Sequence, residues 1–167
     1  MQQLLAATLL LAASAGALAH VTLETPEAAA GGSYKAVLRV PHGCDGSATT
    51  ALRVILPDGF HLAKPMPKAG WQLSTHRQAV TPFDSHGSLI REDVTEIEWR
   101  GGPLPDAFYD EFVFRGTLPA SGEQAWFKVL QQCERGETRW DETPAGDAKA
   151  SHPAPAVRLL PPAGHLH

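Results

Sequence analysis

An all-β fold is predicted for this chain by two observations: apolar residues recur at every second position in short segments, and turn residues separate those segments. Apolar and polar side chains alternate in residues 34–40 and 95–100, which is the period of a strand with one buried face. Gly and Pro lie between the apolar segments, and helical periodicity is weak throughout. This pattern predicts a two-sheet β-sandwich of the immunoglobulin or fibronectin type III kind.

The expected strands end at residues that favour turns, such as Pro57-Asp58-Gly59 and Gly101-Gly102-Pro103. In chain order, the expected strands are residues 20–23, 34–40, 51–56, 72–76, 95–100, 109–117, 125–132, 138–140 and 156–160. The last of these is expected to be an edge strand, because it is a short apolar run between Pro-rich segments.

The first 19 residues are typical of an export signal, because a Leu- and Ala-rich stretch ends in Ala17-Leu18-Ala19, the small-x-small pattern of a cleavage site. The stretch is shorter than the roughly 20 apolar residues of a membrane span, so a retained anchor is the weaker alternative. We expect a signal peptide at residues 1–19, one β-sandwich domain at 20–142 and a Pro-, Ala- and His-rich segment at 143–167. The protein is therefore expected to be periplasmic or secreted.

The composition argues against several functional classes. The net charge is −4 and the 14 Lys and Arg residues are spread along the chain, so nucleic acid is not an expected partner. No segment after the signal is apolar enough for stable membrane insertion. The chain lacks the Gly-x-Ser-x-Gly, His-Glu-x-x-His and phosphate-binding glycine motifs, so we expect no catalytic residues and no enzyme.

The two cysteines, Cys44 and Cys133, are expected to form one disulfide, because export compartments are oxidising. A cysteine metal pair or a redox couple is the alternative, although the two residues are not in a Cys-x-x-Cys arrangement. A disulfide would tie the segment after residues 34–40 to the strand that leads towards Trp140.

Cleavage after Ala19 would make His20 the first residue of the mature protein. Its α-amine and its imidazole Nδ1 can then close a six-membered chelate ring on one metal ion. Nitrogen-rich equatorial sites suit Cu(II), which stands at the top of the divalent affinity order. The amine must lose its proton to coordinate, so the affinity is expected to fall in acid. In the simpler alternative, His20 begins the first strand and binds nothing.

A series of short motifs follows the export signal in a definite order. They are His20-Val21-Thr22-Leu23, Ala30-Gly31-Gly32-Ser33-Tyr34, Arg39-Val40-Pro41, Leu56-Pro57-Asp58-Gly59, Lys64-Pro65-Met66-Pro67-Lys68-Ala69-Gly70-Trp71, Tyr109-Asp110-Glu111-Phe112-Val113-Phe114 and Gln132-Cys133-Glu134-Arg135-Gly136 followed by Trp140. Together they cover nearly the whole mature chain, which resembles the YcnI-like copper-binding domains, a family of exported bacterial proteins.

The resemblance implies a fibronectin-like β-sandwich that binds one Cu(II) per chain through a single-histidine brace. His20 matches the brace histidine, which supplies amine and imidazole, and Trp140 matches a tryptophan beside the metal. An indole N–H is a donor and not a ligand, so Trp140 would limit the access of water or reductant to the ion. The alternative for Trp140 is an ordinary aromatic residue of the sandwich.

The resemblance also implies a carboxylate as a further ligand of the metal, and there the sequence departs from the family. The family's Glu falls just after Val-Pro, where this chain has His42-Gly43-Cys44-Asp45. His42 is the favoured replacement, because a second imidazole would give a three-nitrogen site close to square planar. Asp45 is a second candidate, as an oxygen donor. Cys44 could coordinate only if it were not oxidised, and would then favour Cu(I).

The other histidines are expected to be less important. His61 is placed at a strand edge or turn, and His76 and His86 are placed on either side of a polar loop. The remaining three, His152, His165 and His167, lie in the C-terminal segment, which is expected to be flexible and to bind metal loosely at best.

The sequence therefore predicts an exported copper-handling protein, acting as a chaperone, buffer or delivery protein. A membrane copper transporter or another periplasmic copper chaperone is the expected partner, by resemblance alone. One alternative is a copper enzyme of the polysaccharide-monooxygenase type, in which His42 would complete a two-histidine brace. The other is a metal-free β-sandwich module that docks a membrane copper transporter.

Overall fold

The protein consists of strands and turns, with no helix in the part that the computed structural model describes, residues 20–146 and 148–162. The strands are β1 (Thr22–Leu23), β2 (Glu27–Ala29), β3 (Ser33–Val40), β4 (Thr49–Ile55), β5 (His61–Pro65), β6 (Trp71–Ser85), β7 (Ser88–Leu104), β8 (Asp110–Thr117), β9 (Gln124–Trp126), β10 (Lys128–Cys133), β11 (Glu137–Trp140) and β12 (Ala156–Leu160). The predicted signal at residues 1–19 and the end of the chain, residues 163–167, lie outside the described residues.

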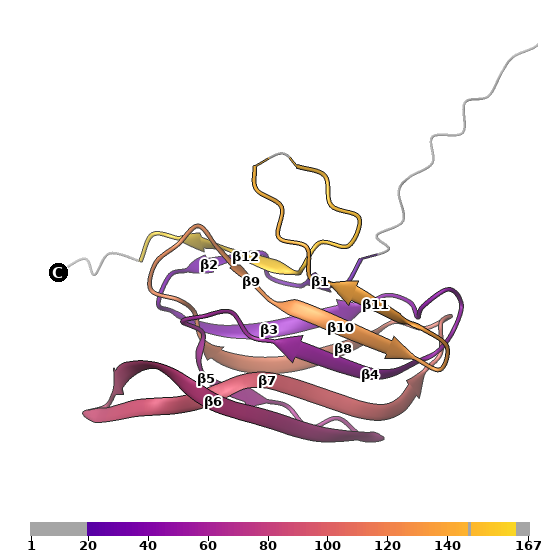
Figure 1. Cartoon of the computed structure of the whole chain (residues 1–167), viewed down its shortest axis with the longest axis horizontal. Helices are drawn as coiled ribbons and strands as arrows, with labels where there is room; N and C mark the ends of the chain where they lie inside the picture. Colours follow the sequence, from indigo (N-terminus) through magenta and orange to yellow (C-terminus); the bar gives the residue numbers. More distant parts are fainter. Residues whose placement is uncertain (1–19, 147, 163–167) are drawn as a thin grey trace, which may run out of the picture.

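The strands form two large sheets and one small sheet (Figure 1). One large sheet has the order β1-β3-β8-β5, the other has the order β11-β10-β4-β7-β6, and the small sheet has the order β2-β12-β9. The predicted edge strand at residues 156–160 is confirmed as a strand, β12, but it lies between β2 and β9 and is the central strand of its small sheet. The all-β sandwich predicted from the sequence is confirmed.

The inner faces of the two large sheets enclose the core. In β3 the alternation in the sequence becomes alternation in space: Tyr34 and Leu38 are buried, whereas Lys35 is exposed. Phe112 of β8 packs edge-on against Trp99 of β7, with ring centroids 5.6 Å apart. These contacts bridge the two sheets and fix their edges relative to each other.

Residues 71–104 form one long hairpin, where the sequence predicts two short strands with a polar loop between them. β6 and β7 pair from Trp71↔Gly101 to Ser85↔Ser88, with two register shifts along the way. The side chains of residues 77–92 are mostly exposed, so no alternation of apolar and polar residues marks these strands. The expected loop was therefore wrong: His76 lies within β6, and His86 lies at the turn of the hairpin.

Two other differences from the predicted strands are smaller. Two strands were not predicted: β2, which has only three residues, and β5, where Leu62 has a φ of 55° that interrupts the strand pattern. The segment expected as one strand at residues 125–132 is divided at Phe127 into β9 and β10, which belong to different sheets.

The predicted disulfide between Cys44 and Cys133 is confirmed, and it closes a sequence separation of 89 residues. It joins the turn after β3 to the end of β10 and leaves no free cysteine in the described chain. Within the described residues there is also no helix of the length and hydropathy that a bilayer crossing requires.

Candidate metal centre

His20 and Trp140 meet where the edges of the two large sheets come together. His20 precedes β1, the edge of the four-stranded sheet, and Trp140 ends β11, the edge of the five-stranded sheet. Their ring centroids are 5.5 Å apart with an interplanar angle of 69°, an edge-on contact. Trp140 is buried and His20 is partly exposed, so the imidazole is accessible from solvent. In Figure 1, β1 and β11 lie beneath the loop that follows β11.

The indole of Trp140 is held by the fully buried side chain of Gln131. Trp140 Nε1 donates a hydrogen bond to Gln131 Oε1 over 3.0 Å. Gln131 Nε2 in turn donates to the carbonyl oxygen of His42 over 2.7 Å and to Thr49 Oγ1 over 2.8 Å. The amide thus uses its oxygen and both of its N–H groups, and it links the orientation of the indole to the turn after β3.

Gln131 is a residue of the site that the sequence analysis missed. Alternation along β10 points Val129 and Gln131 to the buried face, beside Phe127. A polar side chain at an inward position of a strand needs a buried partner, because an unpaired amide in the core is costly. The inward position of Gln131 in the two-residue period of the strand was therefore the signal in the sequence that could have identified it.

His42 lies in the turn after β3, as expected, and is partly buried. Its Nδ1 is 2.6 Å from the carbonyl oxygen of Gly43, so this nitrogen carries the proton and donates. Gly43 N donates to Asp106 Oδ1 over 2.9 Å, which ties the turn to the loop before β8. Through its carbonyl, His42 is connected to Trp140 by way of Gln131.

The other two candidate ligands of this turn occupy different positions. Asp45 is exposed at the tip of the turn with a φ of 47°, and the hydrogen bonds between Cys44 and Ser47 close the turn behind it. Cys44 is bonded to Cys133, and a disulfide sulfur is not a thiolate ligand. Within the part of the chain that the structure describes, no three His, Cys, Asp or Glu side chains are gathered closely enough to hold a metal ion.

A second histidine, His152, contacts the same indole. Its ring centroid is 5.3 Å from that of Trp140, at an interplanar angle of 61°. His152 was expected in a flexible segment, but a β-bridge between Glu142 and Pro153 closes this loop at its base. Nothing in the composition of residues 143–155 indicates this, because the bridge brings together residues that have no periodic pattern.

The remaining described histidines lie elsewhere. His61 stacks on Phe83 at 3.8 Å between ring centroids and lines a groove of about 780 Å³. Its Nδ1 is 3.9 Å from Asp93 Oδ2 and has no hydrogen-bond partner within the described residues. Burial lowers the pKa of His61, and the negative charge of Asp93 opposes that shift in part.

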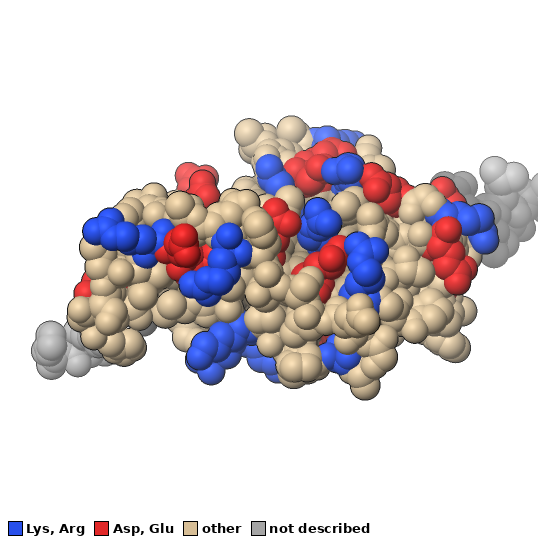
Figure 2. Space-filling view, turned by 60° about the horizontal axis from the view of Figure 1, so that its bottom comes forward, with Lys and Arg blue, Asp and Glu red and all other residues tan. Residues whose placement is uncertain are grey.

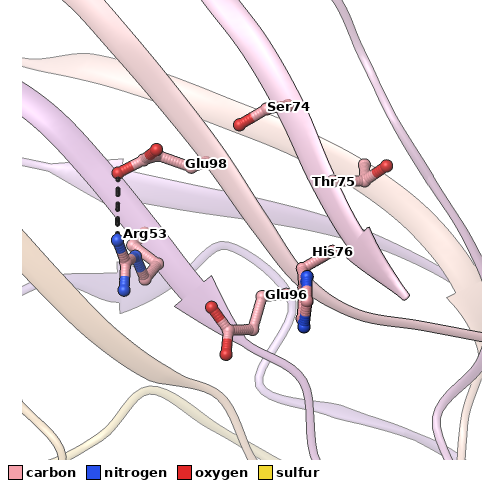
Figure 3. Close-up of a pocket in the computed structure, with 6 residues that line it drawn as sticks. All are labelled: Arg53, Ser74, Thr75, His76, Glu96 and Glu98. Carbon is pink, nitrogen blue, oxygen red and sulfur yellow. Dashed lines mark ion pairs between the residues drawn. The ribbon is translucent and has the colours of Figure 1, made fainter. Parts of the chain in front are cut away.

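A second cavity, of about 350 Å³, lies on the outer face of the five-stranded sheet (Figure 3). Glu96 and Glu98 alternate on β7 and line it together with His76 of β6, as expected for a solvent-facing strand surface. Glu98 pairs with Arg53 at 3.6 Å and with Arg100 at 2.7 Å. On the face drawn in Figure 2, acidic and basic side chains are interspersed and no continuous basic patch forms among the described residues.

A solved structure supports the fold. The chain is similar to an uncharacterised protein from Nocardia farcinica, whose crystal structure reveals an immunoglobulin-like fold, with a TM-score of 0.66 and 26% sequence identity. The similarity covers 84% of this chain and 97% of that one. None of the curated proteins is similar enough to this chain to count as a match.

The family model that matches this chain spans residues 20–159, from His20 into β12. Its description is a domain of unknown function, DUF1775. Since the model covers most of the chain, this protein belongs to the DUF1775 family.

Proposed function

We propose that the mature protein binds one Cu(II) ion at His20 and acts in periplasmic copper handling, as a chaperone, buffer or delivery protein. The observation that carries the proposal is the contact of His20 with Trp140, at 5.5 Å between ring centroids, where the edges of the two large sheets meet. Copper is the cargo of the protein, and no turnover is proposed.

The residues present fit the ion in two respects. The partly exposed imidazole of His20 and the amine that cleavage would create offer two nitrogens in a chelating arrangement, which is suited to Cu(II). The buried indole beside His20 covers one side of the imidazole with an apolar surface. Such a shell limits the approach of water and reductants, which favours retention of the ion over reaction at it.

Proton competition should make this binding dependent on pH. The α-amine coordinates only after it has lost its proton, so acid weakens the site and releases copper. The amine exists only if the chain is cleaved before His20, so the uncleaved precursor is expected to bind copper poorly. Cleavage of the peptide bond before His20 would thus couple export to copper binding.

The proposal is tested by titrating Cu(II) into the mature chain that begins at His20, with electron paramagnetic resonance as the readout. Wild-type protein is expected to give one tetragonal Cu(II) signal per chain, and His20→Ala is expected to lose it. His76→Ala, on the outer face of β6, is the matched control and should bind like wild type. An unchanged signal in His20→Ala would refute the proposal.

A chaperone and an oxidative enzyme differ in what they do with the ion. Since Trp140 lies against His20, we expect no oxygen- or peroxide-dependent turnover when copper-loaded protein is given ascorbate and a polysaccharide. Sustained product formation that depends on His20 would replace the handling role with the monooxygenase alternative.

A further inference from the structure

We propose that His152 supplies an additional imidazole to the copper ion, and that Glu142 positions it. This inference rests on the proposed copper site at His20. It concerns which group adds to the two nitrogens of His20, because no three ligand side chains are clustered within the described residues.

The first observation is that two imidazoles share one indole. The rings of His20 and His152 are 5.5 Å and 5.3 Å from that of Trp140, and both contacts are edge-on. The two histidines are 132 positions apart in the sequence, and each lies near one end of the described residues. Both rings therefore lie against the same side chain at this edge of the sandwich, although the two imidazoles do not contact each other.

The second observation is that the loop carrying His152 is anchored at its base. Glu142 N donates to the carbonyl oxygen of His152 over 3.2 Å, and Ala154 N donates to the carbonyl oxygen of Glu142 over 2.8 Å. These bonds belong to the β-bridge between Glu142 and Pro153. In Figure 1 the loop rises from the end of β11 and returns to β12 beside the same edge. The backbone of His152 is thus held next to Trp140.

The third observation is the carboxylate behind His152. The carboxylate of Glu142 accepts hydrogen bonds from the backbone amides of Ser151 and His152, over 3.1 Å and 3.0 Å. Its Oε1 is 3.7 Å from His152 Nδ1. Metal-bound imidazoles commonly direct the nitrogen that does not bind metal at a carboxylate, which fixes the ring and raises its basicity. This arrangement assigns Nδ1 to Glu142 and Nε2 to the metal.

The side chain of His152 has room to adjust. It is 50% exposed, and Nε2 makes no hydrogen bond within the described residues. Since no three ligand side chains are clustered in the described chain, the proposed coordination by His152 requires its ring to rotate over Trp140. A ligand on an exposed loop can also leave readily, which suits a protein that passes its ion on.

The test counts imidazoles on the metal by pulsed electron paramagnetic resonance of Cu(II)-loaded mature chain, in a background that carries His165→Ala and His167→Ala to remove the terminal histidines. Two imidazoles are expected for this parent. His152→Phe keeps an aromatic ring against Trp140 but has no nitrogen, so one imidazole should remain and the Kd should rise at least about tenfold. His86→Ala, at the turn of the β6–β7 hairpin, is the control and should match the parent.

Glu142→Gln tests the positioning role separately. The glutamine side chain keeps one acceptor oxygen for the backbone amides of Ser151 and His152, but it has no negative charge to direct the Nδ1–H of His152 as a carboxylate does. We expect two imidazoles to remain, with a Kd raised about tenfold in Glu142→Gln and unchanged when the same substitution is made in His152→Phe.

The outcomes separate the two proposals. If His152→Phe leaves both the imidazole count and the Kd unchanged while His20→Ala abolishes the signal, the role of His152 is refuted and the copper site at His20 stands. A parent with a second imidazole that survives His152→Phe would likewise refute it and assign that ligand to another histidine. If His20→Ala has no effect, the proposed function itself fails.

Discussion

At the scale of single residues, the side chain of Gln131 fixes the orientation of the Trp140 indole through a hydrogen bond. Both ends of its buried amide are used, by the indole on one side and by the turn after β3 on the other. Removing one partner of such a buried hydrogen bond destabilises the fold, because the remaining polar group is desolvated and has no hydrogen-bond partner. Trp140 should therefore matter for stability even when no metal is bound.

Trp140→Phe is expected to lower the free energy of unfolding by about 1–3 kcal/mol, because it leaves Gln131 Oε1 buried without a donor. Urea unfolding of metal-free protein measures this. Trp71→Phe is the control, since Trp71 is half-buried and its indole N–H makes no hydrogen bond within the described residues. Equal losses in the two variants would show that ring size, and not the hydrogen bond, accounts for the effect.

His61 should give the fold a dependence on pH that is independent of copper. Its pKa is lowered from 6.5 by burial, so the folded chain takes up this proton less readily than the unfolded chain does. The contribution of His61 to the free energy of unfolding is therefore complete above pH 6.5, where the imidazole is neutral in both states. It is lost as the pH falls below that value. Asp93, at 3.9 Å, is the acidic group that limits the loss.

We expect His61→Gln to flatten the decline in stability between about pH 7 and pH 5, as measured by urea unfolding at a series of pH values. His86→Asn, at the exposed hairpin turn where His86 has a φ of 51°, is the control and should follow the wild-type curve. A decline that is as steep in His61→Gln as in wild type would contradict the role of this histidine.

At the scale of elements, the disulfide joins the two segments that frame the candidate centre. Cys44 lies in the turn that contains His42, and Cys133 ends β10, the strand that carries Gln131. In the chain-entropy model, a cross-link over 89 residues stabilises the fold by about 4.6 kcal/mol, since it restricts the unfolded chain.

The double variant Cys44→Ser, Cys133→Ser is expected to lose about that amount in urea unfolding and to exchange its amide hydrogens faster in residues 41–48. Wild-type protein treated with a reductant should behave in the same way. A loss below about 1 kcal/mol would show that the turn is held by its hydrogen bonds to Ser47 and Asp106 rather than by the cross-link.

The elements also show where sequence patterns succeed and where they fail. The segment 34–40 was predictable, because every second residue of β3 from Tyr34 to Val40 is buried and, apart from Val37, the residues between them are not. The outer half of the β6–β7 hairpin was not, because its side chains are mostly exposed and its pairing depends on its partner strand alone. Alternation reports burial, so a strand without a buried face leaves no pattern in the sequence.

The residues of the candidate centre also differ in whether the sequence could predict them. His20 and Trp140 were placed together by resemblance, and Gln131 was within reach of the period-two argument. The contact between His152 and Trp140 was not, since it depends on a bridge that closes the loop through tertiary structure. Contacts between residues far apart in the chain need topology, which composition does not contain.

At the scale of the whole molecule, one core holds both large sheets and therefore both edges of the centre. Phe112 has no exposed surface, and it packs against Trp99 and Trp71 from the opposite sheet, at 5.6 Å and 5.0 Å. A cavity at this point would loosen the packing of one sheet on the other, and with it the meeting of β1 and β11.

Phe112→Ala is expected to lower the free energy of unfolding by about 3–5 kcal/mol, through lost burial and the cavity that remains. Phe108→Ala is the matched control, because this side chain is 63% exposed, and it should change stability by no more than about 0.5 kcal/mol. Similar losses in both variants would contradict a core that lies between the two large sheets and is centred on Phe112.

Copper binding by the freed amine of His20 can be tested with two chains that differ only at that amine. Both chains begin at His20, and in the second the α-amine is acetylated, so that every side chain of the site is retained and only the amine is blocked. We predict a one-to-one tetragonal Cu(II) resonance for the first chain and its loss in the second. The same resonance with the same affinity in both chains would contradict the claim.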